Sequence, residues 1–437
     1  MDRAVGARMR RFDGAVVGAA LLAGWVLVAP GRVGAQTVER ITFEDAILRA
    51  TTGNPTAQQA AAGIMRAEAL LEQARSRARP ALDASMAVNT IDPVTRFSGA
   101  SINPRAQTAT SATLSASLLA PVAWAQRAQA ADQVLVAQAT AGDIRRLIAV
   151  ATAQAYLAVI AQRRGLELNE RARDAAKAHF EFASQRLAGG IGSRLNMLRA
   201  QQEFSGDEAR VEDARLAVRR AQEALGVLAA ADGPLDAASE PVFETSGDVA
   251  GEHPSGPPTA RFDLRLVAAR QAAAERVVSD SWKDRLPSVT ALFTPQILAP
   301  SGLFAPVRTL RASVIFSTPL FDGGARAAVA RQRSALLDGV KAERAGIERQ
   351  ATAEVRTARE AVRLTERALE RARAASGQSN EVLTITDVAF REGATTNIEV
   401  IDAQRRARDA DTIAALAEDA LRRARLELLV ALGRFPR

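Results

Sequence analysis

The 437-residue sequence contains no cysteine, only two histidines and few aromatic residues (4%). Without cysteine the chain can form neither a disulfide bridge nor a lipid anchor on a cysteine that follows a leader. No cluster of His and Cys has the spacing of metal ligands, so we expect no metal site and no cofactor. The scarcity of aromatic residues, beside abundant Ala, Arg, Glu and Gln, is typical of long helices rather than of thick cores.

Two further absences exclude whole classes of function. No carboxylate is combined with a histidine or a nucleophile in a recognisable catalytic pattern, and no glycine-rich loop follows a buried strand to hold phosphate. We therefore predict that the protein is not an enzyme. The formal net charge is +8, but the basic residues are scattered among acidic ones instead of forming a stripe with interleaved aromatics, so nucleic-acid binding is not expected.

Residues 1–35 have the pattern of a cleaved signal peptide. An apolar run of 15 residues, Ala15–Ala29, is followed by the small-residue sequence Val33–Ala35. The run is preceded by basic residues, which are Arg3, Arg8, Arg10 and Arg11. It is shorter than the about 20 residues that a membrane-spanning helix needs, although an uncleaved anchor is the alternative interpretation.

The rest of the sequence carries the same pattern twice. Arg79–Leu82 opens an alternating segment that Pro121–Trp124 closes, and Arg285–Ser288 and Pro319–Gly324 do the same in the second half. Each half therefore predicts a helix, two strands, a long helix, a glycine-containing turn and a second helix.

This duplication defines the expected domain organisation. We assign residues 36–230 to a first repeat, residues 231–260, rich in Gly, Pro and Ser, to a linker, and residues 261–437 to a second repeat. Each repeat is expected to contain a strand hairpin and a long helical hairpin. These lie at 80–120 and 122–230 in the first repeat and at 287–319 and 324–433 in the second.

Four segments alternate between apolar and polar residues, as strands with one apolar and one polar face do. They are 82–88, 111–118, 288–294 and 310–317. Their lengths approach the 9–11 residues of a tilted strand that crosses a bilayer. Four strands cannot close a barrel, and open sheet edges are not tolerated in lipid, so a membrane barrel would need several chains. A small soluble sandwich is the alternative.

Two helices are expected to be too long for a globular domain. No proline interrupts 124–188 or 325–391, and 65 residues of helix extend for roughly 100 Å. In the second helix, apolar residues recur every eleven positions, as at Val329, Val340 and Ala351. An eleven-residue repeat favours a nearly straight array of side-by-side helices. A coiled-coil rod without a lumen remains the other interpretation of these helices.

Several short motifs stand out when they are taken in their order and in duplicate. They are Ile41–Ala46 with Asn54-Pro55, Ala155–Leu157, Arg261–Leu264 and Pro319–Gly324. Together they resemble the TolC-type outer-membrane efflux protein family. The resemblance extends from Ile41 to Gly433. It implies a mainly α fold with a membrane β-barrel part, in which three chains each give four strands to a twelve-stranded outer-membrane barrel. A long α-helical barrel would continue it through the periplasm of a Gram-negative cell.

The same resemblance implies a passive duct, supplied by an inner-membrane efflux or secretion transporter through a periplasmic adaptor protein. The adaptor would contact the helical tips, where the chain reverses at glycines and where Ser193 or Thr396 can cap the returning helix. The matching tip positions are Gly190, Ile191, Gly192 and Ser193 in the first half and Gly393, Ala394, Thr395 and Thr396 in the second.

The family's periplasmic constriction is acidic, and the matching residues here are Glu399 and Asp402. Their i,i+3 spacing places them on one helix face. Threefold symmetry would turn them into two acidic rings that favour cations and bond to neighbouring Arg or Lys. A solvated surface face is the alternative. The equivalent residues of the first half, Asn196 and Arg199, are not acidic.

The strand-to-helix junctions are a last set of candidate residues. They are Pro121, Trp124, Pro319, Phe321, Gly323 and Gly324. Trp124 fits an aromatic girdle at a membrane interface, or equally a packed junction.

We therefore expect an outer-membrane exit duct of a tripartite efflux or type I secretion system. The alternative is a non-conducting periplasmic scaffold of coiled-coil rods. Bilayer-length amphipathic strands discriminate between the two, because a scaffold has no need for them. The sequence does not reveal the cargo.

Overall fold

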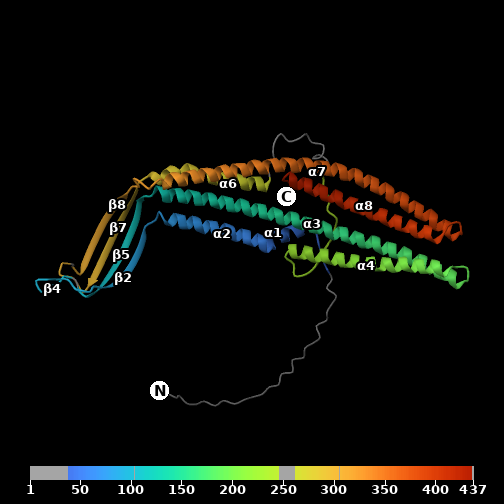
Figure 1. Ribbon diagram of the computed structural model, residues 1–437, viewed down its shortest axis with the longest axis horizontal. Coiled ribbons are helices and arrows are strands. Elements are labelled where there is room, and N and C mark those ends of the chain that lie inside the picture. Colours follow the sequence, from blue (N-terminus) through green and yellow to red (C-terminus); the bar gives the residue numbers. More distant parts are fainter. Residues whose placement is uncertain (1–37, 103, 246–260, 305, 436–437) are drawn as a thin grey trace, which may run out of the picture. The chain divides into compact units, whose positions relative to one another are not determined.

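Long helices dominate the computed structural model, which describes residues 38–102, 104–245, 261–304 and 306–435 (Figure 1). The expected signal peptide at 1–35 and part of the expected linker, 246–260, lie outside the described residues. The residues from Val38 onward form one compact unit.

Both halves follow the element order expected from the sequence. The first half contains α1 (Phe43–Gly53), α2 (Pro55–Ser76), β2 (Ala81–Thr90), β5 (Ala106–Leu119), α3 (Pro121–Ala188) and α4 (Arg194–Leu228). The second contains α6 (Phe262–Ser279), the 3₁₀ helix η1 (Asp280–Arg285), β7 (Ser288–Ala299), β8 (Arg308–Ser317), α7 (Ala325–Arg391) and α8 (Asn397–Ala431). Short strands β1 (Glu39–Ile41), β3 (Arg96–Phe97), β4 (Ala100–Ser101) and β6 (Leu235–Ala237) accompany them.

Helices α1 and α2 are separated by a proline-containing break. The Thr42 hydroxyl accepts a hydrogen bond from the Asp45 amide at 3.2 Å and caps α1. Asn54 caps α2 by accepting from the Thr56 amide at 2.9 Å, and Pro55 occupies the first helical position, where its missing N–H costs nothing. The Asn54 side-chain amide also donates to the Leu228 carbonyl at 3.1 Å, which ties this break to the end of α4.

The main sheet has the order β2-β5-β7-β8 and is antiparallel throughout. Its central pair, β5 and β7, comes from different halves of the chain, so the two repeats share one sheet and β2 and β8 form its edges. The strands have 10, 14, 12 and 10 residues. They are thus longer than the alternating segments read from the sequence.

Strand β7 extends further than the sequence predicts. The expected strand ended at Thr294, before Pro295, yet β7 continues to Ala299. Pro295 lies opposite Leu310 of β8, while the pairing with β5 stops at Gln296 and resumes at Phe293. The proline is therefore accommodated where one ladder is interrupted, which is consistent with its lack of an N–H donor.

The long helices pack as two antiparallel hairpins, α3 with α4 and α7 with α8, and α3 also contacts α2, α6 and α8. Helices α3 and α7 have 68 and 67 residues. Each leads from the sheet to a glycine-containing turn, so the turns lie at the ends of the helices remote from the strands (Figure 1).

The eleven-residue repeat of α7 is only partly buried by these contacts. Ala351 and Val362 are fully buried, Val362 in a cluster shared with α8, whereas Val329 remains 38% exposed nearer the sheet. The sheet-proximal part of this apolar stripe is thus less covered within the chain than the part beside α8.

The largest core cluster surrounds Tyr156, which is the only tyrosine of the sequence and is completely buried. Its hydroxyl donates to the Ser239 carbonyl at 2.8 Å, and its ring contacts Phe43 edge to face. Here α1, α3, α4 and α8 meet the parallel pair β1–β6. Strand β6 lies inside the segment expected to be a linker, and Leu235 is buried, so this segment begins with an ordered, packed strand.

Candidate functional site

The sheet presents a continuous apolar band on one face. Leu82 of β2 lies opposite Leu114 of β5, which lies opposite Phe293 of β7, and Phe293 in turn lies opposite Ala312 of β8. Side chains two residues along a strand share a face, so Val314 of β8 continues the band. Every residue of β2 is exposed, and Val314 is 68% exposed. The single chain therefore leaves this band uncovered.

The first strand-to-helix junction begins α3. Pro121 occupies the first turn of α3 and is buried, and Trp124 is 47% exposed. Trp124 is therefore about half buried at the junction.

The second junction is more open and is built on two glycines. Gly323 and Gly324 adopt φ of 64° and 90°, a conformation that favours glycine. Pro319 is exposed, and Phe321 is 89% exposed. The Asp322 carboxylate accepts hydrogen bonds from the amides of Gly324 and Arg326 at 3.1 and 2.9 Å and so begins α7. Asp322 is a structural residue of this junction that the candidate set from the sequence did not include.

The first helical turn contains four of the candidate tip residues. Gly190 has φ of 76°, which favours glycine, and a Cβ on Gly192 would lie 2.6 Å from the Leu187 amide nitrogen, which leaves no room for a side chain. Ile191 is 74% exposed. The Ser193 hydroxyl accepts from the Leu195 amide at 3.2 Å, which confirms it as the cap of α4.

The second helical turn is built differently. Gly393 has φ of 81°, and the Ala394 amide donates to the Ala389 carbonyl at 2.8 Å. Thr396 occupies the N-cap position of α8, but its side chain makes no capping hydrogen bond there, and its carbonyl accepts from the amides of Glu399 and Val400. The Thr395 hydroxyl is buried with no hydrogen-bond partner among the described residues.

Glu399 and Asp402 lie on the first turns of α8, and both are exposed. Asp402 pairs with Arg406 of its own helix at 3.0 Å. Among the described residues, neither carboxylate bonds to another helix. Both carboxylates therefore lie at the surface of the single chain.

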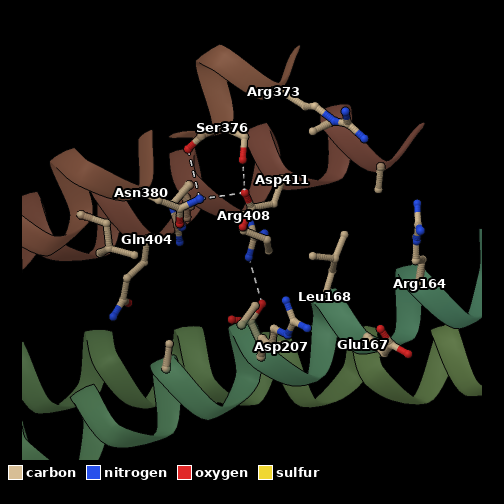
Figure 2. Close-up of a pocket in the computed structure, with 18 of the residues that line it drawn as sticks. Arg164, Glu167, Leu168, Asp207, Arg373, Ser376, Asn380, Gln404, Arg408 and Asp411 are labelled. Carbon is tan, nitrogen blue, oxygen red and sulfur yellow. Dashed lines mark hydrogen bonds and ion pairs between the residues drawn. The ribbon is translucent and has the colours of Figure 1, made fainter. Parts of the chain in front are cut away.

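A charged network, which the sequence analysis missed, connects the two helical hairpins (Figure 2). Glu203 and Asp207 of α4 are 7% and 3% exposed. Arg405 of α8 donates to Glu203 at 3.0 Å, and Arg408 of α8 donates to Asp207 at 2.9 Å. Hydrogen bonds from Arg405 outweigh burial and lower the pKa of Glu203, so this carboxylate stays ionised.

The network borders a cavity of about 610 Å³ between α3 and α4 on one side and α7 and α8 on the other (Figure 2). On the opposite side, Asp411 of α8 accepts hydrogen bonds from Ser376 and Asn380 of α7 at 2.5 and 2.8 Å. The sequence did contain a signal for the network. Acidic residues follow the first turn, and basic residues follow the second turn at similar distances; they are Glu203 and Asp207, and Arg405 and Arg408. Which helix faces meet was not readable.

The chain matches the family model described as "Outer membrane efflux protein" over residues 46–231 and 259–434. No curated protein sequence is significantly similar to it.

The fold is similar to those of several solved outer-membrane proteins. VceC from Vibrio cholerae is 17% identical, with a TM-score of 0.74 over 90% of this chain and 96% of its own. The CmeC outer-membrane channel of Campylobacter jejuni is 14% identical, with a TM-score of 0.74 over 90% and 85%. The open state of the MtrE outer-membrane channel of Neisseria gonorrhoeae is 18% identical, with a TM-score of 0.72 over 90% and 88%.

The family match covers most of both repeats, and the resemblance inferred from the sequence is confirmed. Members of this family are outer-membrane conduits that extend into the periplasm, and they are not enzymes. The chain belongs to the outer membrane efflux protein family.

Proposed function

We propose that three copies of the chain close their sheets into one twelve-stranded barrel, which the α3–α4 and α7–α8 hairpins continue as a periplasmic tunnel. The open edges of the sheet carry this proposal. Among the residues that the structure describes, strands β2 and β8 have no partner on their outer sides, and the apolar band runs across all four strands to both edges. Unpaired backbone groups are costly in lipid, so pairing β8 of one chain with β2 of the next would satisfy both edges.

In this assembly the protein is a passive exit duct of a tripartite efflux or type I secretion system. An inner-membrane transporter would supply the energy, and a periplasmic adaptor would dock on the two helical turns. The exposed Ile191 side chain and the glycine-dependent backbone of both turns support this docking role. A periplasmic scaffold is the competing function, and the uncovered apolar band of the sheet argues against it.

Glu399 and Asp402 would form the constriction of the tunnel. Their exposure in the single chain, one turn apart at the start of α8, supports a pair of acidic rings in the trimer. Carboxylate rings attract cations and repel anions. The Arg406 partner of Asp402 is the candidate donor that limits the width of the aperture.

Planar-bilayer recording tests both the duct and the constriction. The wild-type protein should give discrete, cation-preferring conductance. The double variant Glu399→Ala/Asp402→Ala should give larger conductance or a weaker cation preference. The matched control Glu208→Ala/Asp213→Ala removes two exposed carboxylates from α4 and should behave as the wild type. Absence of any conductance would contradict the duct, and equal behaviour of the two double variants would contradict the constriction.

A further inference from the structure

A second contact between the two helical hairpins, close to their turns, contains a buried histidine. His179 of α3 is 6% exposed, and its Nε2 atom lies 2.7 Å from Oδ1 of Asn397, the first residue of α8. Asn397 is itself 3% exposed. Neither the tips nor the acidic constriction use this pair.

Asn397 connects the histidine to a third helix. Its side-chain nitrogen donates to the Asn196 carbonyl of α4 at 3.4 Å. Because this bond fixes the nitrogen on the α4 side, the side-chain oxygen faces His179 and accepts, so Nε2 carries the hydrogen. The two contacts, His179 with Asn397 and Asn397 with Asn196, therefore join the first hairpin to the second.

Helix α7 closes the remaining side of the histidine ring. The ring centroid of Phe390 lies 5.3 Å from that of His179, and the guanidinium of Arg186 lies 5.8 Å from the Phe390 centroid. The carboxylate that acts on His179 is Asp387 of α7, which pairs with Arg391 at 2.6 Å. From α8 the ring contacts the neutral side-chain amide of Asn397, and burial is the dominant influence on the pKa of His179.

We propose that His179 and Asn397 form a pH-sensitive latch, which holds the two hairpins together near their turns when the histidine is neutral and releases them when it is protonated. The inference does not depend on conduction or on trimer formation, because all its residues belong to one chain.

The direction follows from the cost of burying a charge. Burial lowers the pKa of His179 below its ordinary value of 6.5, while the bond to Asn397 and the charge of Asp387 oppose this effect only in part. An opened latch exposes the ring, which then binds a proton more readily. The closed state is therefore at full stability above about pH 6.5 and loses stability as the pH falls toward the lower pKa of the closed state. The Glu203–Arg405 pair does not respond in this range, because its carboxylate stays ionised.

Amide hydrogen exchange of the full mature chain in detergent, followed by mass spectrometry, tests the latch. Protection of peptides that span 190–200 and 387–400 is compared at pH 7.5 and 5.5 after correction for the intrinsic exchange rate. Acidification should reduce protection in the wild type by about threefold or more. In the variant His179→Gln, which keeps an N–H donor but cannot be protonated, the two pH values should give equal protection.

A smaller loss of protection in the wild type, or an equal loss of protection in His179→Gln, would overturn the inference. Circular dichroism checks that the variant folds. If it does not, Asn397→Asp provides an independent readout, because a carboxylate against the ring favours the protonated form. Its loss of protection should then begin at a lower pH than in the wild type, and an unchanged or higher onset would also overturn the latch.

Discussion

The sheet exposes large apolar side chains that are usually buried, whereas the interface between the helical hairpins buries carboxylates that are usually exposed. In the sheet, large apolar side chains are exposed, as with Leu310 at 70% and Val314 at 68%. Between the hairpins, carboxylates are buried, as with Glu203 at 7% and Asp207 at 3%. Charged side chains are buried only when they are paired, and here the partners come from the same chain. The buried carboxylates of the hairpin interface thus have partners within one chain, whereas the apolar band of the sheet is left exposed in the described part of the chain.

The largest effect is expected in the core that supports the helical region. Tyr156→Ala should reduce the free energy of unfolding by about 3–5 kcal/mol, because it removes a completely buried ring and its bond to the Ser239 carbonyl. Tyr156→Phe keeps the ring and should lose only about 1–2 kcal/mol. Denaturant unfolding followed by circular dichroism measures both. Equal effects of the two variants would mean that the packing of the ring contributes nothing.

A substitution within β8 sharpens the contrast between the two faces of the sheet. Val314→Arg should cost about 2–4 kcal/mol, because an arginine on the lipid face of a membrane strand is strongly unfavourable. Ser313→Arg, one residue away, points to the opposite face and should cost much less. The measurement is the amount of folded protein recovered in the outer-membrane fraction. Equal losses for the two variants would refute the assignment of the apolar face to lipid.

A smaller effect is expected for the charged network. Glu203→Gln should destabilise the chain by about 1–3 kcal/mol, because Arg405 and Arg408 lose a charged partner, and Arg405 is half exposed to water. The control Glu212→Gln, on the exposed side of the same helix, should change little.

This network also predicts a dependence on pH. The folded-state pKa of Glu203 is lowered, so its stabilisation is present above the ordinary value of 4.5 and is lost as the pH falls through the folded-state pKa. The denaturant midpoint of the wild type should therefore fall more on acidification below this value than the midpoint of Glu203→Gln. Parallel curves would contradict the assigned role of the pair.

The sequence predicted most of the architecture because the relevant signals are periodic. Alternation located the four strands of the main sheet, and the absence of proline located α3 and α7. Strand ends were less predictable, since β7 continues through Pro295 by interrupting its pairing with β5. Strand β6 was missed because three residues are too few to show a period.

The site was predictable only where it depends on backbone conformation. Glycine at 190 and 393 predicted the turns, and both residues have positive φ. The His179–Asn397 and Glu203–Arg405 contacts join residues more than 200 positions apart, so they depend on how the hairpins pack. The positions of Glu399 and Asp402 in an assembly depend on other copies of the chain, which a single sequence does not orient.

The most direct test of the incomplete sheet is the mass of the purified mature protein. Native mass spectrometry after extraction in mild detergent should give three chains in one particle, and the protein should remain in the membrane fraction until detergent is added. A stable monomer that dissolves in buffer without detergent would contradict the proposal that β2 and β8 require partners from neighbouring chains.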